Sequence, residues 1–368
     1  MDWSNIVTRL LKVRYPILQA PMLVISSPEM VAAVSNEGGL GSLPVGGLSV
    51  ERTAELIKQT RKLTDKPFAV NLFAHDIPKV KKPELARMSE YLAKLGQQNG
   101  IPYQDQAPET LRFHSYLDQV DILLEEKIPI VSFTFGVLRD EVIQTFKSKG
   151  VILAGTATCV EEALLLDEKG IDLIIAQGME AGGHRGSFLF EESPPLIGSF
   201  CLIPLVTEKV KRPVIAAGGI MDGKTIKAAF ILGARGVQLG TAFLASTESM
   251  AIPSYKRTLQ KTSENEIVLT RSFTGRWARG VRNKFMTSVD KSGIAIPAYP
   301  VQNSLTIPLR TAAQKGDNKD FTTMFAGQAA SKARSAGSSE IFRNLVRETE
   351  MTCALFRFFD CSWPGADR

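Results

Sequence analysis

A glycine-rich segment with one histidine, Gln177–Gly186 (QGMEAGGHRG), holds the residue types best suited to chemistry. It follows an apolar run, Ile171–Ala176, that predicts a fully buried β-strand. His184 is one of three histidines in the chain. Histidine titrates near neutral pH, so it can act as a base or hold an anion, and the flanking glycines let a ligand approach the backbone. We predict that His184 is catalytic, with a purely structural role as the alternative.

Eight short apolar segments alternate with stretches of helical periodicity, which predicts parallel strands joined by helices. The predicted strands are 16–20, 39–43, 68–73, 128–133, 151–154, 171–176, 214–217 and 236–239. Eight such repeats predict an α/β protein with a (β/α)₈ TIM barrel, whose active site lies at the carboxyl ends of the strands. An open doubly wound sheet is the alternative, but no GxGxxG motif opens its first helix.

The alternation ends after Leu239, and basic, glycine-punctuated and proline-rich stretches follow. We therefore predict a barrel over residues 1–245 and an inserted, mainly helical capping subdomain over 246–310. Residues 311–347 are expected to return to the barrel, and 348–368 to form a tail of unknown role.

Two further strand ends are rich in glycine. Gly218 and Gly219 follow the seventh predicted strand, and Gly240 and Thr241 follow the eighth. Barrels often bind phosphate at these two loops, where free backbone N–H groups meet the phosphate oxygens. The alternative is a pair of tight turns without a ligand; we favour a phosphate site.

Polar or sulfur side chains stand at other strand ends, at Met22, Asn71, Gln177 and Gln238. Buried amides need partners. The carbonyls and ring nitrogens of an isoalloxazine would supply such partners at the barrel mouth. Satisfied core amides are the alternative, most of all for Gln238. One phosphate site without a dinucleotide fingerprint favours FMN over FAD.

The composition of the sequence argues against several other classes of protein. The net charge of +6 is mild and no basic run interleaves with aromatics, so nucleic-acid binding is not predicted. The apolar runs are too short to cross a membrane. Four scattered cysteines suit a reducing compartment, and no Cys/His cluster predicts a metal. We expect a cytoplasmic protein without a signal peptide, and possibly a homodimer.

Together, several motifs resemble the nitronate monooxygenase family. They are YPILQAPM, GGLGSLPVGG, PFAVNLF, QGMEAGGHRGSF, VIAAGGIMDG, GVQLGTAFL, GRWARGVRNKF, YPVQNSLTIPLR and MFAGQAA. The resemblance implies a metal-free, FMN-dependent barrel that oxidises alkyl nitronates such as propionate 3-nitronate with O₂, giving a carbonyl compound and nitrite. It makes His184 the active-site histidine and Tyr299 a substrate-side candidate. It places around FMN the residues Met22, Asn71, Gln177, Gly182, Gly219, Gln238, Gly240 and Thr241.

Two other functions fit part of the pattern. Flavin-dependent enoyl-acyl-carrier-protein reductases share the barrel, the phosphate glycines and a GMEAGGH-like loop, and they use NAD(P)H. Gln177, Arg185 and Gly186 favour the oxygen-using branch. A non-catalytic flavin-binding protein is the third possibility. His75 and His114 are interpreted as ordinary surface histidines.

Overall fold

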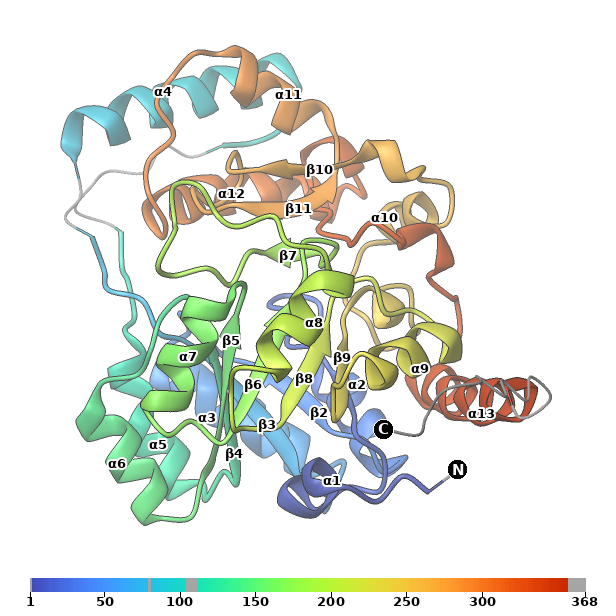
Figure 1. The fold of residues 1–368 in the computed structure, drawn as a ribbon. Coiled ribbons are helices and arrows are strands. Elements are labelled where there is room, and N and C mark those ends of the chain that lie inside the picture. Colours follow the sequence, from blue (N-terminus) through green and yellow to red (C-terminus); the bar gives the residue numbers. More distant parts are fainter. Residues whose placement is uncertain (1, 79–80, 104–110, 357–368) are drawn as a thin grey trace.

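The computed structural model describes residues 2–78, 81–103 and 111–356. Eight parallel strands form one sheet in the order β1-β9-β8-β6-β5-β4-β3-β2. A parallel bridge from Leu18 to Leu40 joins its two ends, so the sheet nearly closes into a TIM-like barrel (Figure 1). All eight predicted strands are present: β1 Ile17–Gln19, β2 Gly41–Pro44, β3 Phe68–Phe73, β4 Ile130–Thr134, β5 Ile152–Ala157, β6 Leu173–Gln177, β8 Val214–Ala217 and β9 Gly236–Leu239.

The barrel strands are buried on both faces, which explains their continuous apolar sequences. Inward-facing side chains such as Leu18, Ile130 and Ile215 form one cluster, and Val7 and Leu11 of helix α1 (Ile6–Leu11) join it. Because α1 occupies one end of this interior, the barrel is a packed core there, and a cavity lies at the carboxyl ends of the strands.

Helices surround the barrel and cover its outer face (Figure 1). Several begin at side-chain caps, as Ser27, Ser49 and Asp222 accept hydrogen bonds from the first turns of their helices. The helices and their bounds are α2 Pro28–Asn36, α3 Val50–Arg61, α5 Val120–Glu125, α6 Asp140–Ser148, α7 Val160–Glu168, α8 Ser199–Thr207, α9 Gly223–Ile231 and α13 Ser338–Phe356.

A second layer lies above the carboxyl ends of the barrel strands (Figure 1). Its elements are α4 Lys82–Gln98, β7 Gly183–His184, α10 Pro253–Leu259, β10 Ile267–Thr270, β11 Ala278–Val281, α11 Lys284–Lys291 and α12 Val301–Lys315. Strands β10, β11 and β7 form an antiparallel sheet, and α4, α11 and α12 share a hydrophobic cluster. The predicted domain limits stay a prediction; α12 runs across the 310/311 limit and α4 comes from the third barrel connection.

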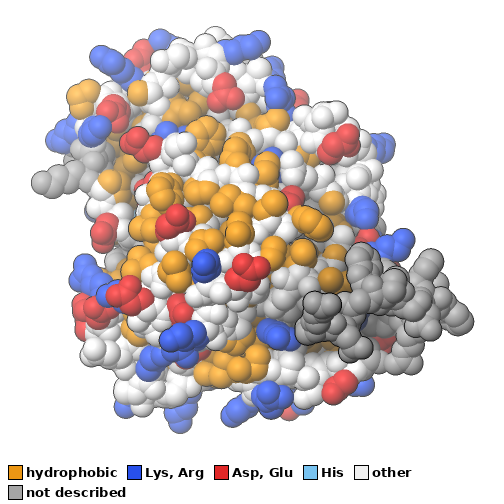
Figure 2. All heavy atoms as spheres, in the orientation of Figure 1, with side chains coloured by type: hydrophobic (Ala, Val, Ile, Leu, Met, Phe, Trp, Pro, Cys, Tyr) orange, Lys and Arg blue, Asp and Glu red, His pale blue; other side chains and the backbone are white. Residues whose placement is uncertain are grey.

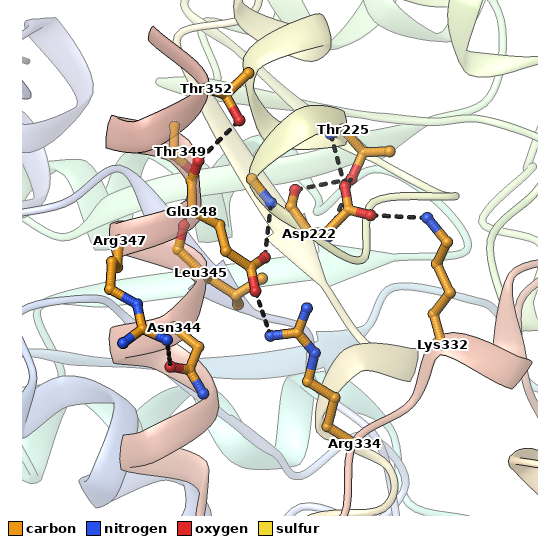
Figure 3. Close-up of polar contacts among 11 residues, drawn as sticks. Asp222, Thr225, Lys332, Arg334, Asn344, Leu345, Arg347, Glu348, Thr349 and Thr352 are labelled. Atoms are coloured by element: carbon orange, nitrogen blue, oxygen red, sulfur yellow. Dashed lines mark hydrogen bonds and ion pairs between the residues drawn. The ribbon is translucent and has the colours of Figure 1, made fainter. Parts of the chain in front are cut away.

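Helix α13 is fixed to the start of α9 by a polar network (Figure 3). Glu348 accepts from the backbone N–H of Gly223 at 3.2 Å and pairs with Arg334 at 2.6 Å. Asp222, which caps α9, pairs with Lys332 at 2.7 Å. Residues 348–356 therefore continue α13, which contacts the start of α9 through Glu348 and Thr349.

The contact between α9 and α13 predicts a stability effect. A Cβ atom on Gly223 would lie 2.3 Å from both Glu348 C and Thr349 N. We expect Gly223→Ala to lower the free energy of unfolding by about 1–3 kcal/mol, because overpacking must separate two helices. Gly316→Ala is the control, since its Cβ would meet only Ala313 O at 3.7 Å. Urea unfolding of both variants tests this, and equal stabilities would contradict it.

An apolar patch lies on the face that carries α8 (Figure 2). Phe200 is 78% exposed, and Leu196 and Leu205 are about half exposed. The predicted homodimer stays a prediction. Among the described residues, no helix is long and apolar enough to cross a membrane.

Candidate active site

One cavity of about 360 Å³ lies at the carboxyl ends of the barrel strands, beneath the second layer. It has the size and the mixed apolar and polar lining of a small-molecule site. The structure brings every sequence-predicted site residue to its wall: Met22, Asn71, Gln177, Gly182, His184, Gly218, Gly219, Gln238, Gly240, Thr241 and Tyr299. Apart from Tyr299, which precedes α12, these residues come from five separate strand ends, and their convergence on one cavity follows from the parallel barrel.

Gln177 organises the loop that carries His184. Its Nε2 donates to the backbone oxygen of His184 at 3.0 Å, and its Oε1 accepts from Gly186 N at 2.9 Å. The sequence predicted an open loop here, but Gly183 and His184 form the short strand β7, paired with β11. His184 is therefore held by a sheet of the second layer as well as by the barrel.

Gly182 allows this loop to pack against the chain that returns to the barrel. A Cβ there would lie 2.4 Å from Ala326 C and Gly327 N. Gly327 N in turn donates to Thr241 Oγ1 at 2.9 Å. The requirement for glycine at 182 is thus explained by close backbone packing next to the cavity.

The His184 ring is oriented by Thr274, a buried residue that the sequence analysis did not select. His184 Nε2 lies 2.9 Å from Thr274 Oγ1, and this hydroxyl lies 3.2 Å from the carbonyl oxygen of Arg276. A proton on Nε2 satisfies both contacts, because Thr274 then accepts from the ring and donates to the carbonyl. Nδ1 has no hydrogen-bond partner among the described residues, so it is the ring atom available to a ligand.

His184 is uncharged at neutral pH. Burial, and to a smaller extent the nearby positive charges of Arg276 and Arg310, lower its pKa to about 3. An imidazole with this pKa is a weak base at neutral pH. The electrostatics therefore suit hydrogen bonding to an anion better than removal of a proton from carbon.

Aromatic rings enclose the histidine. Phe325, Phe135 and Tyr299 lie 5.2, 5.4 and 6.0 Å from the His184 ring centroid, all near edge-to-face. Phe135 has a positive φ of 75°, a strained conformation for this residue type. These rings form an aromatic wall around the His184 ring.

His75 is not an ordinary surface histidine, so that interpretation was wrong. Its ring packs 4.8 Å from the Tyr299 ring, and both ring nitrogens are buried without a hydrogen-bond partner among the described residues. Burial lowers its pKa to about 4. His75 thus supports Tyr299 from behind the cavity wall. His114 is partly exposed.

The two glycine-rich strand ends form a concave surface at the other side of the cavity. Gly218 and Gly219 have φ values of 109° and 70°, which glycine adopts without strain. The N–H groups of Gly219 and Gly240 donate no backbone hydrogen bond within the described chain. Free N–H donors beside the start of a short helix, Thr241–Phe243, fit an anionic group such as phosphate.

Arg310 is another wall residue that the sequence analysis did not select. It ends the motif YPVQNSLTIPLR, and Thr274 directly precedes GRWARGVRNKF. Both motifs were recognised, but only Tyr299 was taken from them. The two motifs indicated this part of the chain. The sequence alone did not show which of their side chains face the cavity.

The buried histidines predict a pH dependence of stability. Their pKa values fall from 6.5 to about 4 for His75 and about 3 for His184, so the unfolded chain binds more protons just below pH 6.5. Their contribution is complete above that pH and is lost as the pH falls toward about 4 for His75 and about 3 for His184. Each histidine adds a slope of about 1.4 kcal/mol per pH unit.

Replacing His75 by phenylalanine tests this dependence. Between pH 6.2 and 5.2, roughly the upper part of the window, the free energy of unfolding should fall less steeply in His75→Phe than in the wild type. Urea titrations at several pH values measure the difference. Parallel curves would show that His75 is protonated in the folded protein.

The fold is a TIM-like barrel with a cavity at its strand ends. The cavity holds a glycine-rich surface suited to phosphate and an enclosed histidine, which defines a small-molecule enzyme of the α/β-barrel class. The comparisons specify the family. The nitronate monooxygenase model matches residues 4–348, and the chain belongs to this family. It is therefore an oxidoreductase of a flavin-dependent family.

Individual relatives agree with the family match. A probable nitronate monooxygenase of Staphylococcus saprophyticus is 39% identical over 95% of this chain and 98% of its own. The structure resembles nitroalkane oxidase from Streptomyces ansochromogenes, with a TM-score of 0.84, 36% identity, and coverage of 96% and 100%. It also resembles FabK from Thermotoga maritima, with a TM-score of 0.75, 29% identity, and coverage of 97% and 99%.

Proposed function

We propose that the protein binds FMN and oxidises alkyl nitronates with O₂, releasing a carbonyl compound and nitrite, with propionate 3-nitronate as a substrate. The observation that carries this proposal is that the uncharged, enclosed His184 and the free glycine N–H groups line one and the same cavity. One end of the cavity thus suits a phosphate and the other suits a small anion.

The wall residues fit FMN. Gly218, Gly219, Gly240 and Thr241 would hold its phosphate through backbone N–H groups. Asn71, which donates to Ser132 at 3.0 Å, and Gln238 would face the ring system. When bound, the flavin supplies the electron transfer and the reaction with oxygen.

The protein's own residues bind and orient the nitronate. A nitronate is already deprotonated at carbon, so its oxidation needs no strong base. In the complex, His184 would take the tautomer with its proton on Nδ1 and donate this N–H to a nitronate oxygen. The Thr274 hydroxyl would then donate to Nε2 instead of to the Arg276 carbonyl. Tyr299 and Phe135 close the site against water, which strengthens the hydrogen bond to the nitronate.

Oxygen uptake and nitrite release test the proposed function. Purified protein with propionate 3-nitronate should consume O₂ and release one nitrite for each nitronate lost, without NADH or NADPH. Heat-released cofactor should be FMN by chromatography. No nitrite from any alkyl nitronate, together with rapid bleaching of the flavin by NADH or NADPH, would favour the enoyl-thioester reductase instead.

A further inference from the structure

Arg310 is a cation on the cavity wall without a carboxylate partner. It is the one lysine or arginine among the described residues that line the cavity. Its Nη1 donates to Thr323 Oγ1 at 3.1 Å, and its Nη2 donates to both Asn303 Oδ1 at 2.8 Å and Asn303 O at 3.1 Å, so one N–H of Nη1 is left for a ligand. Its Nε is buried and has no partner within the described chain. The guanidinium is thus oriented by neutral groups, and its charge is not compensated.

Arg276 differs from Arg310 because its charge has a carboxylate partner. It also lies near His184, but it pairs with Glu191 at 3.2 Å and stacks over the Phe135 ring at 4.2 Å. Its charge is already compensated by a carboxylate. A buried charge without such a partner is costly unless a ligand supplies the opposite charge, so Arg310 needs an anion that Arg276 does not.

The position of Arg310 indicates which anion this is. Arg310 projects from α12, where Asn303, Thr311 and Gln314 also line the cavity. Its charge acts on His184, so it lies on the reacting side of the cavity. The phosphate surface at Gly219 and Gly240 lies on barrel strand ends, whereas Arg310 belongs to the second layer.

We propose that Arg310 binds a carboxylate on the carbon chain of the substrate, so that the site selects nitronates with a second negative charge. A guanidinium charge without a carboxylate partner, with one N–H of Nη1 left to donate, suits a carboxylate. His184 would hold the nitronate group, and Arg310 the far end of the same molecule. This inference rests on the proposed function.

Two nitronates of equal chain length distinguish the contact proposed for Arg310 from the contact proposed for His184. Propionate 3-nitronate carries the carboxylate and propyl-1-nitronate does not. We expect Arg310→Gln to lower kcat/KM for propionate 3-nitronate by about ten- to a hundredfold, with propyl-1-nitronate changed by less than about threefold. Arg310→Lys should recover part of the loss. The matched control is Lys315→Gln, which removes an exposed positive charge from the same helix.

The binding of a carboxylate ligand tests the role of Arg310 without enzymatic turnover. Succinate replaces the nitronate group by a carboxylate and should perturb the flavin absorbance of the wild type, but not of Arg310→Gln; butyrate serves as the comparison without a second charge. An equal loss on both nitronates, or no loss on either, would overturn the assignment. If the wild type oxidises neither nitronate, the proposed function fails, and succinate binding that depends on Arg310 still decides this inference.

Discussion

His184→Asn should retain FMN but oxidise propionate 3-nitronate with kcat/KM lowered by about ten- to a hundredfold. A hydrogen bond to a charged group contributes about 1.5–3 kcal/mol, and each 1.4 kcal/mol is about a factor of ten in rate. The flavin should stay bound, because the proposed phosphate contacts lie in the loops that follow β8 and β9. Steady-state kinetics and the FMN content of the purified variant measure the two effects. His114→Asn is the control outside the cavity.

The same variant separates two roles of the histidine. If His184 were an obligatory base, the nitronate would react nearly normally, and the parent nitroalkane would lose activity by about a hundredfold or more. A pKa of about 3 argues against that role at neutral pH. Wild-type rates on both substrates in His184→Asn would show that the residue is structural, against our central assignment.

Gly240→Val should weaken FMN binding by about a hundredfold or more while the apoprotein remains folded. Gly240 has a negative φ, −105°, and a Cβ there would make ordinary contacts with Ala20 Cβ at 3.5 Å and Met22 Sδ at 3.6 Å. The added methyl groups would cover the N–H donor proposed for the phosphate, which removes a charge-assisted hydrogen bond and adds a steric clash.

Gly219 gives a less selective test. Its Cβ would also have room, 3.4 Å from Glu180 Cβ, but its φ of 70° strains any other residue. A valine there would therefore lower stability as well as FMN affinity. Fluorescence titration of apoprotein with FMN, with Gly316→Val as the control, tests the Gly240 prediction. Unchanged FMN affinity in Gly240→Val would remove this loop from the cofactor site.

The strands and the convergence of the site were predictable, because both follow from local pattern and topology. Strands such as Ile171–Ala176 are buried on both faces, and their apolar runs identify them without long-range information. The parallel barrel then brings Asn71, His184 and Gly240 to one end.

Pairings between distant segments were not predictable from one sequence. Gln177 was correctly placed at a strand end, but both ends of its amide are used by its own loop. His75 looked like a loop histidine because its packing partner, Tyr299, comes from the second layer. Arg310 was missed for the same reason, since its lack of a carboxylate partner is visible only after folding.

Anaerobic mixing of the FMN-loaded protein with propionate 3-nitronate tests the central claim most directly. We expect the visible absorbance band of the flavin to be lost without any nicotinamide donor. Admission of O₂ should restore the band as nitrite appears. A flavin band that every alkyl nitronate leaves unchanged would contradict the account.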